Sequence, residues 1–147
     1  MGFSGEYFNS IDAKGRLSIP ARLRSLLQDE FGDDQLVVTR AREALVAYPV
    51  SRWSEICAAV DAMPNGPQRD LIYRNRISPA IEAGFDSQGR IALTPSLRQI
   101  AGFEKDVVIV GVGEKIELWS QTRFIAQMQA SEEQLAGLSS ELGALGF

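Results

Sequence analysis

Residues Ile11–Leu26 read IDAKGRLSIPARLRSL, and residues Phe85–Ile100 read FDSQGRIALTPSLRQI. Aligned without gaps at an offset of 74 residues, the two stretches share five identical positions out of 16, and four more positions are apolar in both. The identical pairs are Asp12 with Asp86, Gly15 with Gly89, Arg16 with Arg90, Leu23 with Leu97, and Arg24 with Arg98. Self-similarity at a fixed separation indicates an internal repeat, so the chain is predicted to hold two copies of one structural unit.

A second set of matches comes next in the same order, at an offset of 71 residues. It pairs Val37-Val38 with Val108-Ile109, Leu45 with Ile116, Tyr48 with Trp119, Arg52 with Arg123, and Trp53 with Phe124. The change of offset corresponds to a loop that is three residues shorter in the second copy. Because both blocks keep their order, we interpret the whole chain as a duplication.

Each copy is predicted to fold as β-β-α-β-β-α. A strand leads to Asp12 or Asp86, and a four-residue turn comes after it in which Gly15 or Gly89 takes a positive φ. The next residues alternate polar and apolar, as a half-buried strand does, and a helix then begins near a proline. The remaining elements are strands over 36–40 or 107–110, strands over 45–48 or 116–119, and a helix capped by Ser51 or Ser120.

The duplication divides the chain into four predicted segments. They are a first unit over 1–62, a connecting turn and helix over 63–84, a second unit over 85–126, and a weakly helical tail over 127–147. A unit of this size has too little apolar surface to close a core alone, so the two units are expected to pair about a pseudo-twofold axis. The predicted fold class is α+β, mainly β, as one barrel-like domain with peripheral helices.

Composition excludes most catalytic and metal sites. The 147 residues include no His and one Cys, which removes Ser-His-Asp and Cys-His systems and zinc sites made of imidazoles or paired thiolates. No cofactor or metal is therefore expected. The net charge of −4 argues against a general polyanion binder. No apolar run approaches the about 20 residues of a membrane span, so no membrane partner and a cytoplasmic location are expected.

One local group of cations contrasts with this acidic background. It consists of Lys14, Arg16, Arg22 and Arg24, and the only acid within residues 11–24 is Asp12. A basic hairpin and helix can contact the phosphates and base edges of DNA. A solvated basic face is the common alternative. On the residues alone, both interpretations stay open.

The Asp-x-x-x-Arg spacing of Asp12–Arg16 and Asp86–Arg90 also has two interpretations. In the structural one, the carboxylate holds the guanidinium across the glycine turn, and the guanidinium keeps a second edge for phosphate or guanine. In the catalytic one, the pseudo-twofold axis brings Asp12 and Asp86 together as the acid–base pair of a hydrolase. An adjacent arginine opposes the raised pKa that such a pair needs, so no enzyme is expected.

These motifs resemble the MraZ family. The resemblance rests on Asp12–Pro20 (DAKGRLSIP), on the second motif Asp86–Arg90 and on Val107–Trp119 (VVIVGVGEKIELW). It implies a bacterial transcriptional regulator made of two AbrB-like swapped-hairpin units (SpoVT-AbrB domains) and assembled as a ring-like homo-oligomer. It further implies binding to double-stranded DNA at short direct repeats upstream of the division and cell-wall gene cluster, including the protein's own gene, and association with the nucleoid. A ring-forming scaffold with no role on DNA is the alternative.

The resemblance places the DNA contacts on the first hairpin and on the residues directly after it. The predicted contacts are Lys14, Gly15, Arg16, Arg22 and Arg24, with Arg16 as the base reader. The predicted structural turn residues are Asp12, Asp86, Gly89 and Arg90. The second copy has Gln88 in place of Lys14 and Ser96 in place of Arg22, so it is expected to bind DNA less well.

A second cluster of cations lies in the connecting segment, at Arg69, Arg74 and Arg76. Apolar residues alternate with these arginines, which favours an amphipathic helix that packs on the protein. On such a helix the arginines can pair with acids of a neighbouring subunit, and contact with DNA is the less favoured alternative.

Overall fold

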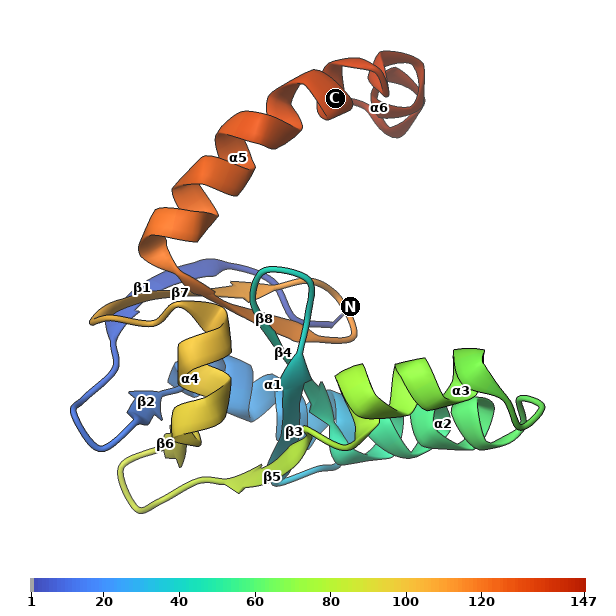
Figure 1. Cartoon of the computed structure of the whole chain (residues 1–147). Coiled ribbons are helices and arrows are strands. Elements are labelled where there is room, and N and C mark those ends of the chain that lie inside the picture. The colour runs from blue at the N-terminus through green and yellow to red at the C-terminus, as the bar shows by residue number, and fades with distance from the viewer. Residues whose placement is uncertain (1) are drawn as a thin grey trace.

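The computed structural model describes residues 2–147, which form a mixed α/β fold with antiparallel sheets at its centre and six α-helices around them (Figure 1). The strands are β1 (Glu6–Ser10), β2 (Arg16–Ser18), β3 (Gln35–Arg40), β4 (Leu45–Pro49), β5 (Ile81–Gly84), β6 (Arg90–Ala92), β7 (Asp106–Gly111) and β8 (Ile116–Ser120). The helices are α1 (Ala21–Phe31), α2 (Val50–Asp61), α3 (Pro67–Ile72), which a π-helical turn over Tyr73–Ile77 continues, α4 (Pro95–Ala101), α5 (Gln121–Ala136) and α6 (Ser139–Leu145). The β-β-α-β-β-α order of each copy is confirmed.

The strands of the two copies are interleaved. The six-stranded sheet has the order β1-β7-β8-β4-β3-β5, and a two-stranded sheet pairs β2 with β6. Exchanging each strand for its counterpart, β1 for β5, β3 for β7 and β4 for β8, gives the same order read from the opposite edge of the sheet. β5 lies within residues 63–84, which were predicted to form the connecting segment, but as the counterpart of β1 it belongs with the second copy. Both edge strands therefore hydrogen-bond to the other copy: β1 to β7, and β5 to β3. Neither copy can form this sheet alone.

One hydrophobic core serves both copies. Its centre includes Leu17 of β2 and Ile91 of β6, which face each other in the two-stranded sheet and are fully buried. The same cluster takes in fully buried residues of both longer hairpins, namely Leu36, Val38, Leu45, Ala47, Ile109 and Leu118. As expected, the two units share one core, and both contribute residues to it.

Each glycine turn is held by the other copy. Gly15 and Gly89 have φ values of 80° and 76°, a region that L side chains rarely adopt. The backbone N–H of Leu93 donates to the Gly15 carbonyl at 2.8 Å, and the N–H of Ile19 donates to the Gly89 carbonyl at 3.1 Å. A Cβ at Gly15 would lie 2.7 Å from the carbonyl oxygen of Leu93, the residue directly after β6, so the turn approaches this backbone too closely for any side chain.

The two predicted N-caps have different outcomes. Ser120 caps α5 as expected, because its hydroxyl accepts a hydrogen bond from the Arg123 N–H at 3.1 Å. The prediction for Ser51 is wrong, since α2 begins one residue earlier, directly after Pro49. The ring of Pro49 fixes a φ of −55°, which sets the entry into the helix. Ser51 instead donates from both its N–H and its hydroxyl to the carboxylate of Asp33, at 3.1 and 2.8 Å.

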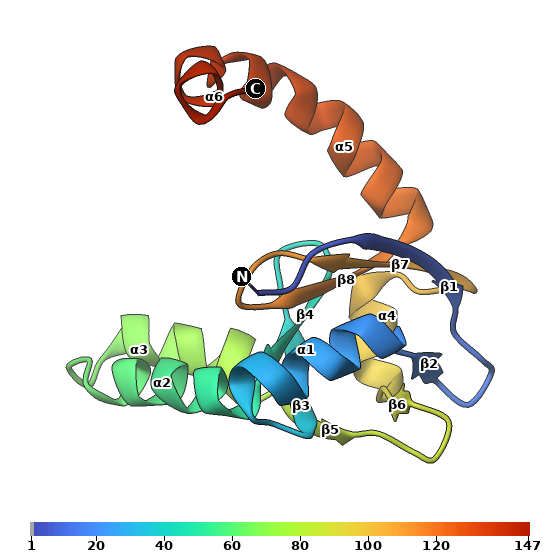
Figure 2. The same ribbon diagram turned by 180° about the vertical axis from the view of Figure 1, so that it is seen from behind.

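Two helical segments project from the sheets (Figures 1 and 2). One is the connecting segment, where α3 lies alongside α2 in both views, in agreement with the helix predicted there. The other is the C-terminal segment, where α5 leads away from the sheet to α6. Within residues 2–147, no helix combines the length and the apolar character needed to cross a membrane.

The interleaved sheet predicts that the two copies unfold together. Trp53 lies in the first copy and Trp119 in the second, so Trp119→Phe leaves a fluorescent reporter of the first copy and Trp53→Phe a reporter of the second. Because each edge strand is bonded to the other copy, we expect fluorescence and circular dichroism to give the same urea midpoint within each variant. A fluorescence transition clearly separated from the circular dichroism transition would show that the copies unfold independently.

The close approach at Gly15 predicts a graded series of glycine substitutions. Gly32→Ala is the control, because Gly32 also has a positive φ but has open space around its Cβ position. It should destabilise the protein by roughly 1–2 kcal/mol, the cost of a left-handed conformation for an L residue. Gly15→Ala should cost clearly more, because the new methyl group also meets a backbone carbonyl. Urea denaturation measures both, and equal losses would contradict the close approach.

Candidate nucleic-acid interface

Asp12 and Asp86 organise the two hairpin turns. One carboxylate oxygen of Asp12 accepts hydrogen bonds from the N–H groups of Lys14 and Arg16, at 3.0 and 2.8 Å. The other accepts from Arg16 Nε at 2.7 Å. Asp86 repeats the arrangement with its own turn and with Arg90 Nε at 2.8 Å. Each aspartate thus fixes both the backbone of its turn and the direction of one arginine.

The same contacts oppose the hydrolase alternative. The pKa of Asp12 lies below its usual range, chiefly because its carboxylate accepts the backbone N–H of Arg16. The pKa of Asp86 is lowered in the same way, by the N–H of Arg90. An acid–base pair of aspartates needs one raised pKa, which these hydrogen bonds disfavour. No cluster of three or more potential metal-ligating side chains occurs within residues 2–147.

Arg16 and Arg90 occupy equivalent positions but differ in their surroundings. The Arg16 side chain is 37% exposed, and its ion pair is with Asp12 alone among the residues described. The Arg90 side chain is 24% exposed, and it pairs with Asp86 and also approaches Asp12, with Nη1 at 4.0 Å from the carboxylate. Because Arg16 uses only its Nε on Asp12, both terminal nitrogens of its guanidinium remain for a ligand.

The other predicted contact residues do not form one group: Lys14 and Arg24 lie near the two glycine turns, whereas Arg22 lies away from them. Lys14 is exposed at the tip of the first turn. Arg24 is half-buried, donates from Nε to the Ile19 carbonyl at 3.1 Å and lies against the glycine of the second turn. Arg22 is exposed on α1 but reaches Ser4 Oγ at 3.4 Å, and Ser4 lies at the opposite end of β1 from the Asp12 turn. Lys14 and Arg16 therefore belong together, whereas Arg22 points elsewhere.

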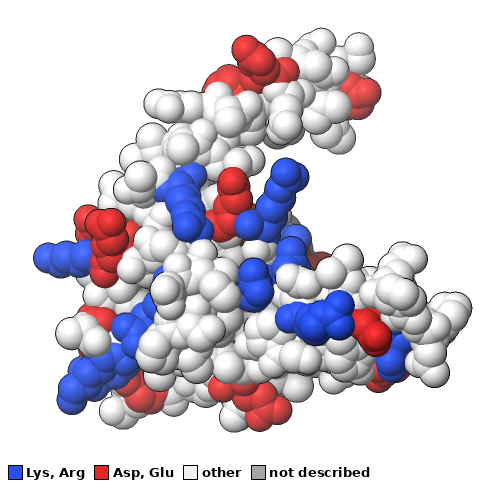
Figure 3. All heavy atoms as spheres, viewed as in Figure 1, with Lys and Arg blue, Asp and Glu red and all other residues white. Residues whose placement is uncertain are grey.

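Both turns lie at one end of the molecule, and cations gather there. Figure 1 shows the turns before β2 and β6 next to each other at the lower left, and Figure 3 shows Lys and Arg side chains over the same region. Sequence reasoning missed Lys105 and Arg98, which line a hollow beside Asp12. The backbone N–H of Ile11 donates to the Lys105 carbonyl at 2.8 Å. Only the pairing of β1 with β7 brings Lys105 here, and that pairing is a long-range feature of the fold.

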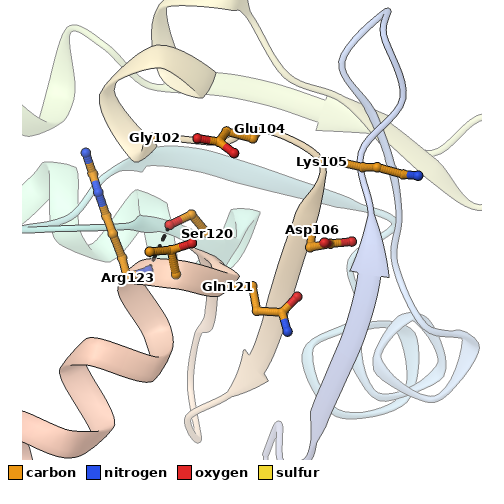
Figure 4. A pocket seen from close by; sticks show the side chains of 8 residues that line it. Gly102, Glu104, Lys105, Asp106, Ser120, Gln121 and Arg123 are labelled. Atoms are coloured by element: carbon orange, nitrogen blue, oxygen red, sulfur yellow. Dashed lines mark hydrogen bonds between the residues drawn. The ribbon is translucent and has the colours of Figure 1, made fainter.

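A second hollow, of about 350 Å³, lies where α4, β7 and α5 meet (Figure 4). It contains acidic, basic and hydroxyl side chains, but they do not converge on one point. Figure 4 shows Arg123 and Lys105 extending to opposite sides, and Ser120 is occupied in capping α5. Arg123 Nη1 donates to the Ile100 carbonyl at 2.8 Å, so its guanidinium serves a structural contact between α5 and the backbone of α4. The hollow therefore lacks the arrangement of an active site.

Comparison with known proteins identifies the family. The family described as "MraZ protein" matches residues 2–71 and 77–142. A protein of Syntrophotalea carbinolica is 43% identical over 150 residues, with both chains covered completely. A protein of Halothermothrix orenii is 36% identical with 99% of each chain covered, and one of Geobacter sulfurreducens is 39% identical with 81% of this chain and 83% of its own covered. All three are named transcriptional regulator MraZ. The chain belongs to the MraZ family.

Proposed function

We propose that this protein is a sequence-specific DNA-binding transcriptional regulator that reads base edges with the first hairpin. The observation that carries the proposal is Arg16, held by Asp12 through Nε with its terminal nitrogens unpaired. A guanidinium fixed in this way can bind O6 and N7 of guanine in the major groove. The names of the related proteins support the regulatory role.

Lys14 and the second hairpin supply the contacts that position the protein. Lys14 extends from the turn tip as a flexible charge suited to a phosphate. Gly15 keeps the turn narrow, so that backbone and DNA can approach closely. Arg24, carried by α1, places a cation beside the second turn, where Gln88 stands in place of a lysine. Both turns then face the DNA, with base reading concentrated in the first.

The target and the assembly are those that the family resemblance implies. We propose that the protein acts as a ring-like homo-oligomer of AbrB-like swapped-hairpin units on short direct repeats upstream of the division and cell-wall gene cluster, including its own gene, at the nucleoid. The net charge of −4 supports this, because one subunit offers few cations on an acidic body. Several identical hairpins on evenly spaced repeats make each later contact intramolecular. Multivalency then compensates for weak individual contacts.

Arg16→Ala should abolish specific DNA binding and leave the fold intact. Losing a bidentate base contact costs on the order of 1–3 kcal/mol per site, and the loss multiplies over several subunits. Arg90→Ala is the matched control, because it removes the equivalent arginine from the copy that lacks the neighbouring lysine. Gel-shift titration on the DNA upstream of the protein's own gene measures both. Equal binding by the two variants would contradict the proposed asymmetry, and full binding by Arg16→Ala would refute the base reader.

Affinity should rise steeply with the number of repeats in the DNA. We expect light scattering to give a mass larger than a dimer, and titrations to show weak binding to one repeat and tight binding to two or more. The reason is that a single hairpin neutralises few phosphates at physiological salt. A monomer by light scattering, or full affinity for a single repeat, would exclude the multivalent mechanism while leaving the family assignment untouched.

A further inference from the structure

The helix α5 is the counterpart of α2, but it has no helix beside it. In the first copy, α3 lies alongside α2 (Figures 1 and 2), and the Asp61 carboxylate of α2 accepts hydrogen bonds from Arg69 and from the Tyr73 hydroxyl. In the second copy, α5 extends from the sheet with only Phe124 buried among its described residues. The duplication thus leaves one helix face uncovered.

The uncovered face carries exposed apolar side chains on either side of one acid. Met128 holds the position in α5 that Cys57 holds in α2, yet Cys57 is half-buried whereas Met128 is 49% exposed. Leu135 is 48% exposed, and Glu132 lies between these two side chains at helical spacings of four and three residues. Further exposed apolar residues continue along this segment, namely Ile125, Leu138, Leu145 and Phe147. Such a concentration on a projecting helix is typical of a protein–protein contact.

The charge of the same segment limits what can cover it. After Arg123 the chain contains three acids, Glu132, Glu133 and Glu141, and no cation. None of these acids forms an ion pair within residues 2–147. Glu133 lies in the last turn of α5, where the helix dipole disfavours negative charge. A complementary surface must offer an apolar side chain flanked by a cation.

The outer face of α3 and of the π-helical turn that continues it has both properties. Leu71 is 56% exposed, and Arg74 comes one helical turn later, exposed and without an ion pair among the described residues. Residues 67–77 contain three arginines and one acid, Asp70. Arg69 is engaged with Asp61 and stacks over Tyr73 at 4.9 Å, so it serves the contact with α2. Leu71 and Arg74 remain for an outside partner.

We propose that the α5 stripe, defined as Met128, Glu132 and Leu135, docks on the α3 face of a second copy of this chain. The α3 face is defined as Leu71 of α3 and Arg74 of the π-helical turn that continues it. Leu71 of one copy packs between the two apolar residues of the stripe, and Arg74 pairs with Glu132. Because the two surfaces differ, the contact is head-to-tail, and it continues from copy to copy until it closes into a ring. This inference rests on the proposed homo-oligomer and names the surfaces that build it.

Charge reversal tests the pairing. Glu132→Arg and Arg74→Glu should each lower the mass measured by light scattering by about twofold or more, and the double variant should restore it, because the ion pair is re-formed in the opposite sense. Asp29→Arg, an exposed acid on α1, is the matched control and should leave the mass unchanged. Circular dichroism verifies the fold of each variant. Assembly that is unaffected by the single changes would overturn the proposed contact without affecting the oligomer itself, whereas a monomeric parent protein would overturn both.

A neutral variant separates assembly from DNA binding. Met128→Gln combined with Leu135→Gln should disrupt the assembly without adding charge. Its affinity for a single repeat should equal that of the parent protein, and its gain in affinity from additional repeats should disappear. Loss of single-repeat binding in this variant would show that the stripe contacts DNA or supports the fold, and would overturn the proposal.

Cross-linking distinguishes the head-to-tail contact from a two-fold pairing of α5 helices. With the single natural cysteine removed by Cys57→Ala, the combination Leu71→Cys and Leu135→Cys should form disulfide-linked ladders under mild oxidation. Leu135→Cys alone should remain uncross-linked. Efficient cross-linking by Leu135→Cys alone would establish an α5–α5 contact, and no cross-linking by the pair would indicate that another partner covers the stripe. Either result refutes the proposed contact.

Discussion

The fold depends on one constraint: each edge strand of the large sheet is hydrogen-bonded to the other copy of the repeat. β1 pairs with β7, and β5 pairs with β3. A single copy would leave these strands unpaired and half of the core exposed to water. The short β2–β6 sheet adds the same kind of contact at the centre, where Leu17 meets Ile91. Pairing with a second unit is therefore a condition of forming this sheet, and the positions of both glycine turns depend on it.

The element order could be predicted from sequence because it depends on local signals. The alternation after Gly15, the apolar runs and the serine before α5 each carry their own information. The N-cap at Ser51 was mispredicted because Pro49 and the carboxylate of Asp33 act in its place, and Asp33 comes from a distant loop. Lys105 was missed for a related reason, since a pairing between strands about a hundred residues apart brings it beside Asp12. Local sequence chemistry predicts the helices and strands, whereas the residues that become spatial neighbours depend on the topology of the whole fold.

In the Asp-x-x-x-Arg motif, the proposed DNA contact uses other atoms of the arginine than those that stabilise the turn. Its aspartate binds two backbone N–H groups and the Nε of the arginine, which fixes the turn and directs the guanidinium. The terminal nitrogens take no part in this, so a contact with DNA does not compete with folding. Fixing the orientation of the arginine in advance lowers the entropy lost on binding. The same geometry appears in the second copy, where the approach of Arg90 to Asp12 uses part of that freedom.

The two copies differ at the positions on which the proposed function depends. A fully symmetric chain would present two equal hairpins and two equal helices, so nothing would distinguish one end of the subunit from the other. Here the first hairpin has Lys14 where the second has Gln88. In addition, α3 lies alongside α2, whereas no helix within residues 2–147 lies alongside α5. In the proposed function, this loss of equivalence gives each subunit one preferred DNA-reading hairpin and two dissimilar ends. Dissimilar ends permit the proposed head-to-tail growth. That growth would repeat the same hairpin at a constant spacing, which is the geometry suited to the proposed direct repeats in DNA.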